Sequence, residues 1–376
     1  MFSREDYRMP AEWEAQSGVQ LTWPHAGTDW APMLQEITTT YEEMAREISK
    51  REPLLIVAPE GTQEYSTARS TEGRLLPTGR KNVQWSMVNT NDTWARDHGF
   101  ITLVPTQPSA LNTQPSPLLL DFQFNGWGAK FPAELDNAIN RHLYDEGRVR
   151  GQYVDCLNFV LEGGSIESDG QGTIFTTTGC LMAPHRNQPL TKDEIEARLL
   201  QTLCAKRIVW IDHGHLVGDD TDGHIDTLVR ICPDDTLLYM SCDDPQDEQY
   251  EELRLMEEEL KTLRTLDGKP YRLLRLPSPR PLYESAEGVT SHLSPLTSHL
   301  DRLPATYANF LIINGAVLVP TYAQPDLDRE ACRIIGQAFP DREIVPIDSR
   351  AIIRQHGSIH CCTMQFPEGA LLPNEK

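Results

Sequence analysis

A cysteine near the end of the chain is the first residue whose type and setting could support covalent chemistry. Cys361 lies in the segment HGSIHCCTMQFP at 356–367, a polar, glycine-led stretch remote from any run that reads as core. A nucleophilic cysteine needs access and a nearby positive group that stabilises its thiolate. Taken alone, Cys361 or its neighbour Cys362 is equally an ordinary buried thiol. On an extended segment, only one of the two side chains can point into a site.

A histidine and an aspartate two residues apart form the second candidate group. His224 and Asp226 belong to the segment DGHID at 222–226. If this segment is a strand, both side chains lie on one face and point into one cavity. The histidine can carry a proton between a leaving group and water, and the aspartate can bind a planar cation. A half-buried histidine paired with a neighbouring carboxylate is the alternative interpretation.

Two further carboxylates stand beside residues that allow a ligand to come close. Asp97 follows Trp94 in the segment WARD, and Glu162 precedes two glycines in LEGGS. A guanidinium offers five N–H donors in a fixed plane, and carboxylates around it accept them in pairs. One cysteine, one histidine and several carboxylates fit a guanidinium better than an amide or a phosphate, with Trp94 as a flat apolar wall. By itself, the EGG motif is equally a turn with an exposed glutamate.

Metal binding is the competing use of these side chains. A metal site built on His224 and Asp226 would need further ligands at short spacing, as in HExxH, and none occurs. The pairs His213/His215 and His356/His360 are each incomplete. We therefore expect neither a metal nor a cofactor.

Composition restricts the partners and the location of the protein. The chain has 376 residues, 39% of them hydrophobic, and a formal net charge of −21. This charge argues against nucleic acid or an anionic membrane as partner and is compatible with a small cationic substrate. No basic and apolar leader is present, and no apolar run approaches the about 18 residues of a membrane span. The eight cysteines form no CxxC pair, so we expect reduced thiols and a cytoplasmic location.

The elements that must position these residues alternate between strands and helices. Apolar runs predict strands at Leu54–Ala58, Phe100–Val104, Leu118–Phe122, Thr173–Thr177, Arg207–Ile211, Thr236–Met240, Tyr271–Leu276, Phe310–Val319 and Glu343–Ile347. Helical periodicity predicts helices at Met33–Arg51, Thr191–Ala205, Gln246–Leu266 and Pro325–Phe339. The second helix opens with the capping-box spacing Thr191-x-x-Glu194. The stretches Pro105–Pro117 and Pro277–Pro304 predict surface loops. This alternation indicates an α/β fold, in one domain over residues 1–376.

The spacing of the candidates suggests how such a fold would bring them together. Asp97, Glu162, His224, Asn309 and Cys361 follow one another at intervals of about one ββαβ unit. Such spacing suits a closed, pseudo-fivefold arrangement in which each unit delivers one group to a common centre. No obvious internal sequence identity accompanies it.

Assembled, these segments resemble the agmatine deiminases, a branch of the guanidino-modifying enzymes (the pentein superfamily) that also contains the peptidylarginine deiminases of the Porphyromonas type. The resemblance spans nearly the whole chain in the family's order. It is carried by MPAEWE at 9–14, LTWPH at 21–25, NDTWARDHG at 91–99, LEGGSIESDGQGT at 161–173, DGHIDTLVR at 222–230, YANFLIINGAVLVPTY at 307–322 and HGSIHCCTMQFP at 356–367. It implies a five-bladed, pseudo-fivefold α/β propeller without cofactor or metal.

The resemblance also implies catalytic roles. Cys361 follows the histidine of the family's IHC segment and would be the nucleophile that attacks the guanidinium carbon of agmatine. His224 would protonate the departing ammonia, leaving a covalent thiouronium, and would then deprotonate the attacking water. Asp97 and Asp226 would hold the guanidinium, and Glu162 would orient it and assist proton transfer. The product, N-carbamoylputrescine, lies on the route to putrescine, so the expected enzyme is a hydrolase of C–N bonds in linear amidines.

Two further positions follow from the resemblance, and one departs from it. Trp94 and Asn309 would contribute to substrate binding, Asn309 by supporting the Cys–His pair. The family usually has a non-cysteine residue after the nucleophile, whereas this chain has Cys362.

Three other functions stay open at this point. A deiminase acting on arginine or on arginine side chains needs a cationic subsite for the carboxylate, and the known peptidyl type carries a secretory signal. An amidinotransferase would use the same intermediate with an amine acceptor. A non-catalytic propeller that binds cations would survive the loss of Cys361. The sequence admits a homo-oligomer and leaves the preferred length of the substrate amine open.

Overall fold

The computed structural model describes residues 5–62, 82–106, 116–285, 288–290 and 300–373. Within these residues strands and helices alternate, so the predicted α/β class is confirmed. Most of the predicted loop Pro105–Pro117 lies outside the described residues, as does part of Pro277–Pro304. The described part of the second loop contains a hairpin, β14 (Tyr283–Ser285) with β15 (Gly288–Thr290), so this stretch is not loop throughout. None of the described helices is long and apolar enough to cross a bilayer.

Five units of one topology contain most of the described strands. In each unit a first strand pairs antiparallel with a second, which pairs parallel with a third. The first strands are β19 (Thr363–Pro367), β5 (Ile101–Pro105), β8 (Glu167–Ser168), β11 (Val229–Cys232) and β16 (Leu311–Ile313). The second strands are β2 (Gln16–Thr22), β6 (Leu118–Gln123), β9 (Thr173–Thr177), β12 (Thr236–Met240) and β17 (Ala316–Thr321). The third strands are β3 (Leu54–Ala58), β7 (Gln152–Val160), β10 (Arg207–Ile211), β13 (Arg272–Leu276) and β18 (Glu343–Asp348).

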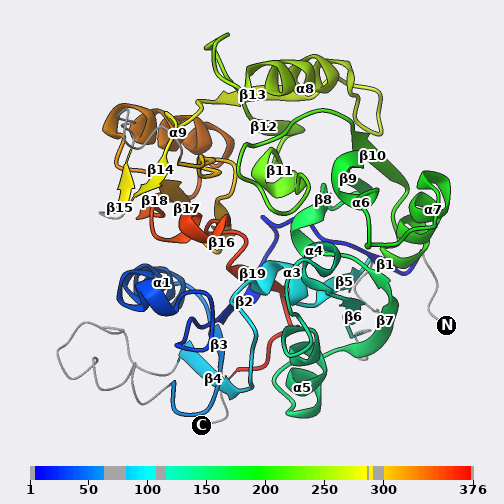
Figure 1. Cartoon of the computed structure of the whole chain (residues 1–376). Coiled ribbons are helices and arrows are strands. Elements are labelled where there is room, and N and C mark those ends of the chain that lie inside the picture. The colour runs from blue at the N-terminus through cyan, green and yellow to red at the C-terminus, as the bar shows by residue number, and fades with distance from the viewer. Residues whose placement is uncertain (1–4, 63–81, 107–115, 286–287, 291–299, 374–376) are drawn as a thin grey trace.

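A helix connects the second strand of each unit to the third, because parallel neighbours need a long crossover. These helices are α1 (Leu34–Ser49), α5 (Ile139–Asp145), α7 (Lys192–Thr202), α8 (Tyr250–Thr262) and α9 (Pro325–Ala338). Figure 1 shows them on the outside of the molecule, with the first strands nearer its centre. Two outlying strands extend the sheets, β1 (Tyr7–Arg8) next to β5 and β4 (Val83–Met87) next to β3.

The crossover helices follow from their sequence patterns. In α1, the buried residues Ile37, Tyr41, Met44 and Ile48 recur at helical spacing and give the helix one apolar face. In α7 the predicted capping box is present, since the Thr191 hydroxyl accepts from the Glu194 N–H and the Glu194 carboxylate accepts from the Thr191 N–H. Both helices are a few residues shorter than predicted. The helix α7 ends before Cys204, whose φ of +54° is incompatible with a continued right-handed helix.

The two ends of the described chain meet in one sheet. Strand β19 pairs antiparallel with β2, with Thr363 opposite Leu21. The sheet therefore has the order β19-β2-β3-β4 and combines strands from opposite ends of the sequence. The segment that carries Cys361 leads directly into this strand, so its position depends on the N-terminal strands.

One predicted strand is divided in two. The apolar run Phe310–Val319 forms β16 and β17, which make a hairpin across Asn314 and Gly315. Gly315 has a φ of +76°, a conformation that glycine adopts without strain and that favours a tight reversal. The apolar character of the run reflects the burial of both strands and therefore hides the turn between them.

Candidate active site

The candidate residues occupy equivalent places in the five units, each just before a first strand. Asp97 lies in the short helix α3 (Ala95–His98) before β5, and Glu162 precedes η4 (Gly163–Ser165) and β8. His224 caps η5 (Ile225–Thr227) before β11, and Asn309 and Cys361 stand two residues before β16 and β19. The side chains of all these residues are at least 96% buried.

Gly164 marks the point where three of the candidates meet. A Cβ atom at this position would lie 2.6 Å from Nδ1 of His224, 2.9 Å from Oδ1 of Asp97 and 3.1 Å from Oδ2 of Asp226. The Gly164 N–H donates to Oδ1 of Asp97 at 3.1 Å. The second glycine of the EGG motif therefore allows this close approach of the three side chains, and any larger residue would separate them.

The segment from 222 to 226 is not the strand that its sequence predicted. Asp222 and Gly223 both have positive φ, and Ile225–Thr227 forms a turn of 3-10 helix. The Asp219 carboxylate accepts from the Gly223 N–H at 2.7 Å and stabilises this irregular backbone. The prediction failed because such local side-chain hydrogen bonds compete with strand formation.

Cys361 lines a cavity of about 40 Å³. The other lining residues include the acidic side chains Asp29, Asp92, Asp97 and Asp220 together with the aromatic residues Trp94, Trp127 and Phe131. Its Sγ lies 3.9 Å from Oδ2 of Asp226. Burial, followed by the charges of Asp226 and Asp97, raises the pKa of the Cys361 thiol well above its ordinary value. In the unliganded site the sulfur is therefore a neutral thiol.

The two neighbouring thiols face different surroundings, although not for the predicted reason. Residues 359–362 form a hydrogen-bonded turn rather than an extended segment, with the Thr363 N–H donating to the His360 carbonyl at 3.0 Å. Cys361 borders the cavity, whereas Cys362 is fully buried in the core around α1. The turn, not strand alternation, separates their side chains.

The surroundings of His224 favour its protonated, positively charged form. Its Nδ1 lies 3.7 Å from Oδ1 of Asp97. Burial alone would lower the pKa of His224, but Asp97, the sulfur of Cys180 and Asp226 raise it to about 10. Burial in turn raises the pKa of Asp97 to about 6, although His224 opposes this. Near neutral pH the site thus holds an imidazolium beside an aspartate, a proton donor next to an acceptor.

A network of buried hydrogen bonds positions Asp226 and Cys361. Oδ2 of Asp226 accepts from Nδ1 of His360 at 2.7 Å, and Nε2 of His360 lies 2.8 Å from the Glu12 carboxylate. Oδ1 of Asn309 accepts from the N–H groups of His360 and Cys361, at 3.0 and 3.2 Å. Asn309 therefore holds the backbone of the cysteine and is not among the described residues that line the cavity.

Glu162 is fixed by an arginine that sequence reasoning did not identify. Nε of Arg186 donates to Oε1 of Glu162 at 3.0 Å, and both side chains are fully buried. Two other nitrogens of Arg186 bind the Asp222 carboxylate and the Thr221 carbonyl, which ties Glu162 to the loop before His224. Arg186 lies far along the chain from both partners, so no spacing in the sequence could indicate this contact.

Two tryptophans form one wall of the cavity. Nε1 of Trp94 donates to Asp92, and Nε1 of Trp127 donates to Oδ2 of Asp97, each at about 3 Å. The two rings contact each other edge to face. Trp127 adopts φ +56°, a conformation rarely found outside glycine, and is held there by the contact with Asp97. Sequence reasoning missed Trp127, although its position between two glycines in NGWGA is a signal of unusual backbone.

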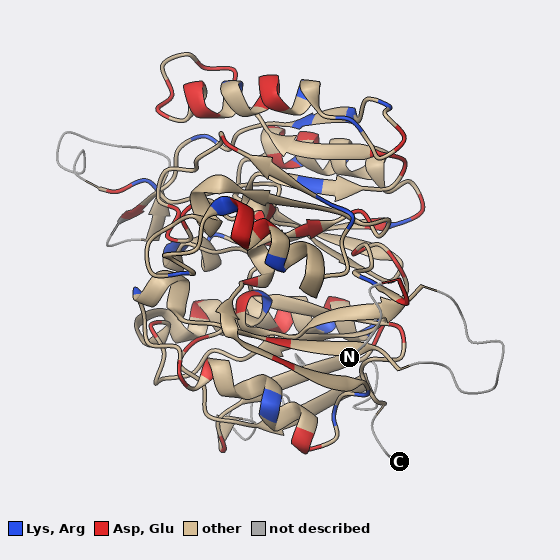
Figure 2. Ribbon diagram, turned by 90° about the vertical axis from the view of Figure 1, so that its right-hand side faces the viewer, with Lys and Arg blue, Asp and Glu red and all other residues tan. Residues whose placement is uncertain are grey.

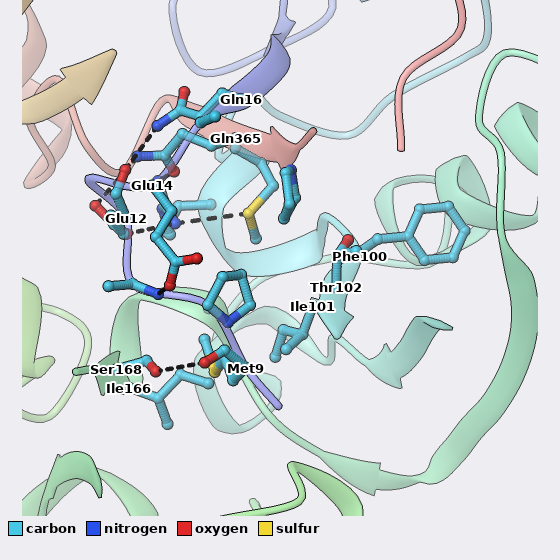
Figure 3. A pocket seen from close by; sticks show the side chains of 17 residues that line it. Met9, Glu12, Glu14, Gln16, Phe100, Ile101, Thr102, Ile166, Ser168 and Gln365 are labelled. Carbon is cyan, nitrogen blue, oxygen red and sulfur yellow. Dashed lines mark hydrogen bonds and ion pairs between the residues drawn. The ribbon is translucent and has the colours of Figure 1, made fainter. Parts of the chain in front are cut away.

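A larger cavity, of about 60 Å³, lies elsewhere and does not contain the cysteine. Figure 3 shows Glu12, Glu14, Gln16 and Gln365 along one side of it and Phe100, Ile101 and Thr102 opposite them. Arg96 and Gly163 border it, so it lies behind the segments that carry Asp97 and Glu162. The smaller cavity is the candidate active site, because Cys361, Asp97 and Trp94 line it. His224 and Asp226 lie beside Asp97 at Gly164 and, like Glu162, are not among the described residues that line this cavity.

Two groups of side chains have donor atoms close enough to hold a metal ion. The first comprises Glu162, Cys180 and His224, and the second Glu12, Glu167 and His360. In the second group, the guanidinium of Arg230 already binds both glutamates, so that cation satisfies their charge. Only the first group keeps donor atoms that make no hydrogen bond with the described residues.

The chain as a whole is similar to known proteins of one family. The family model for the Porphyromonas-type peptidyl-arginine deiminases matches residues 8–367. An agmatine deiminase from Pseudomonas putida is 33% identical, with 96% of each chain covered. A solved agmatine deiminase from C. jejuni, with substrate bound, has a TM-score of 0.82 at 36% identity and covers 96% of this chain and 97% of its own. A Porphyromonas gingivalis structure provisionally named arginine deiminase has a TM-score of 0.85 at 45% identity, over 97% and 100%.

Proposed function

Because the chain belongs to the family of Porphyromonas-type peptidyl-arginine deiminases, we propose that it is an agmatine deiminase. The reaction converts agmatine and water into N-carbamoylputrescine and ammonia, a step toward putrescine. Named agmatine deiminases among its relatives support this, including one solved with substrate bound. The substrate is a small guanidinium compound, and neither nucleic acid nor a membrane is a partner.

Unpaired buried acceptors among the candidate residues are the observation that carries the proposal. Oδ1 of Asp226 and Oε2 of Glu162 are buried and have no hydrogen-bond partner among the described residues. Buried carboxylate oxygens are nearly always hydrogen-bonded, so such atoms indicate a missing donor. A guanidinium supplies several N–H donors in one plane together with the positive charge that the carboxylates lack.

In the proposed first step, the bound guanidinium activates the cysteine. Its charge offsets those of Asp97 and Asp226, which otherwise raise the pKa of Cys361, and so favours the thiolate. The thiol proton is released to solvent as the substrate binds. The sulfur attacks the central carbon, and the C–N bond to one terminal nitrogen breaks. His224, which is charged at neutral pH, gives its proton to that nitrogen, and ammonia leaves.

In the second step, water completes the hydrolysis. His224, now neutral, takes a proton from a water molecule that attacks the thiouronium carbon, and the C–S bond breaks to release the substituted urea. Glu162, held by Arg186, orients the guanidinium and assists proton transfer. Trp94 provides a flat wall of the cavity. Asn309 positions the backbone of Cys361 and supports the site from outside the cavity.

The proposal extends to architecture and location. We take residues 1–376 as one catalytic domain with a five-bladed, pseudo-fivefold α/β propeller. The five similar units, and the pairing of β19 with β2, support this arrangement. The eight free cysteines support a reducing, cytoplasmic location. Figure 2 shows Asp and Glu on outer elements as well as near the middle, interspersed with Lys and Arg, so much of the net charge belongs to the surface.

Arginine deimination is the second candidate function, favoured by the name of the Porphyromonas gingivalis relative. It would require a positive group for the substrate carboxylate. Among the described residues that line the cavity there are four aspartates and no lysine or arginine. This lining favours agmatine, which ends in an amine.

We predict that the purified protein hydrolyses agmatine in the presence of EDTA and without an added cofactor. The cysteine, the histidine and the carboxylates supply the nucleophile, the proton transfers and the charge that the reaction needs. Release of ammonia and of N-carbamoylputrescine, measured by mass spectrometry, checks this. A loss of activity on chelation that zinc restores would contradict the cofactor-free mechanism.

A second prediction concerns the choice between agmatine and arginine. A carboxylate-lined cavity repels the additional negative charge of arginine. We expect kcat/KM for agmatine to exceed that for free arginine by at least about tenfold, which corresponds to about 1.4 kcal/mol. The two substrates and a peptide ending in arginine should be compared side by side. Equal turnover of agmatine and arginine would favour the second candidate.

A further inference from the structure

A buried thiol that the proposed reaction does not use lies beside two of its residues. Ligand atoms of Glu162, Cys180 and His224 all lie within 4.8 Å of one another, and the three residues are buried. Oε2 of Glu162 and both ring nitrogens of His224 make no hydrogen bond with the described part of the chain. A sulfur, a ring nitrogen and a carboxylate oxygen thus lie close to one another.

Local hydrogen bonds fix the position of Cys180. Cys180 lies in the short helix α6 (Thr178–Leu181), where its N–H donates to the hydroxyl of Thr177 at 3.2 Å. The same hydroxyl donates to the carbonyl of Gly223, the residue before His224, at 2.6 Å. One threonine therefore holds together the backbones that carry the thiol and the imidazole, while Arg186 fixes Glu162 from the other side.

We propose that Glu162, Cys180 and His224 form a binding site for a zinc ion that inhibits the enzyme reversibly. Thiolate, imidazole and carboxylate are the ligands that zinc prefers, at about 2.0–2.3 Å, and three protein ligands leave a fourth position for water. Tetrahedral coordination would bring the three donor atoms to about 3.5 Å from one another, a small movement of side chains from their present spacing. The thiol proton of Cys180 and the imidazolium proton of His224 are both released to solvent as the metal binds.

The inhibitory part of this inference rests on the proposed function, whereas the binding site does not. A metal on Oε2 of Glu162 and on His224 occupies the groups that orient the guanidinium and transfer protons. Zinc and agmatine should therefore exclude each other. Because Cys180 has no part in the proposed reaction, its removal should weaken the metal site and leave turnover in the absence of metal within a few-fold of the unmodified enzyme.

The binding site can be tested without reference to activity. Cobalt(II) added to the metal-free protein should give a thiolate-to-metal charge-transfer absorption at one equivalent, and zinc should abolish it. Cys180→Ala should lose the absorption and weaken zinc binding, measured by calorimetry, by at least about tenfold. Cys156→Ala is the matched control, since Cys156 is also a buried free thiol but lies on β7, and it should behave like the unmodified protein. Cys180→Ser, which keeps the side-chain volume, repeats the comparison if the alanine variant folds poorly.

The inhibitory role is tested by kinetics. Zinc should inhibit agmatine hydrolysis competitively, EDTA should reverse the inhibition, and Cys180→Ala should raise the inhibition constant by at least about tenfold. Equal inhibition of the variant, or a cobalt absorption that survives in it, would overturn the proposal and point to Cys361 as the metal's thiolate ligand. If the protein hydrolyses no guanidine compound, the proposed function fails, and the cobalt and calorimetric results still decide whether the site exists.

Discussion

Replacing Cys361 by serine is expected to abolish turnover of agmatine, with kcat lower by about 10⁴-fold or more. The serine hydroxyl cannot form an oxyanion at neutral pH. The Asp226 carboxylate near it, with Oδ2 3.9 Å from the sulfur, is already hydrogen-bonded to His360 and is too weak a base for a hydroxyl. The bound guanidinium favours a thiolate at Cys361. It cannot lower the pKa of a serine hydroxyl enough to deprotonate it, because that pKa is much higher. Rates of ammonia release at saturating agmatine measure the effect.

Cys362→Ser is the matched control for this substitution. Cys362 is fully buried in the core around α1 and is not among the described residues that line the cavity. Its replacement should retain most of the activity and reduce only stability. Mass spectrometry of enzyme quenched during turnover should find a substrate adduct on the peptide with both thiols, and fragmentation should place it on Cys361. An adduct on Cys362, or an active Cys361→Ser enzyme, would show that the assignment is off by one residue.

Replacing Arg230 by methionine is expected to reduce the free energy of unfolding by about 3–5 kcal/mol, because it leaves buried charges without their partner. The Arg230 guanidinium is fully buried and donates to Glu167, to Glu12 at 2.6 Å and to the Ala308 and Phe310 carbonyls. Methionine fills much of the volume but supplies neither charge nor donors. Denaturation in urea, with circular dichroism as the signal, measures the loss.

The loss in free energy of unfolding caused by Arg230→Met should also depend on pH. Burial alone would raise the pKa of Glu12, but His360, Arg96 and Arg230 hold it well below its ordinary value. Without Arg230, the folded-state pKa of Glu12 rises, so the stability lost in the variant grows as pH increases from the low native pKa of Glu12 toward its higher pKa in the variant. The difference should thus be larger at pH 8 than at pH 5. Arg333→Met, which removes an exposed pair with Glu330, should change stability by less than about 0.5 kcal/mol at either pH. A loss of equal size in both variants would contradict this account.

Regular elements with strong apolar patterns could be predicted from the sequence. The strands Leu54–Ala58, Thr173–Thr177 and Thr236–Met240 have the predicted bounds, since each is a short, fully buried run. The two-residue strand β8 could not be predicted, because it exists only through its pairing with β9. Strand β19 likewise depends on a partner from the other end of the chain.

Only part of the candidate site could be predicted from the sequence. Cys361, His224, Asp226, Asp97 and Glu162 could be chosen by their side-chain chemistry and by the resemblance to a family. The convergence of His224, Asp226 and Asp97 on Gly164 could not, since it depends on turns whose geometry comes from local side-chain hydrogen bonds. No spacing in the sequence indicated that Cys180 or Arg186 belongs to the site. Their contacts arise from tertiary structure alone: Arg186 fixes Glu162, and Cys180 lies beside His224.

The pairing of β19 with β2 affects the order in which a newly made chain becomes active. During synthesis, β2 and β3 leave the ribosome early, and one edge of β2 has no neighbour until β19 follows. The proposed nucleophile, Cys361, belongs to the same late segment, so a chain interrupted before residue 361 both lacks this thiol and exposes an unpaired strand edge. Incomplete chains would therefore lack the proposed nucleophile and expose a strand edge that promotes aggregation.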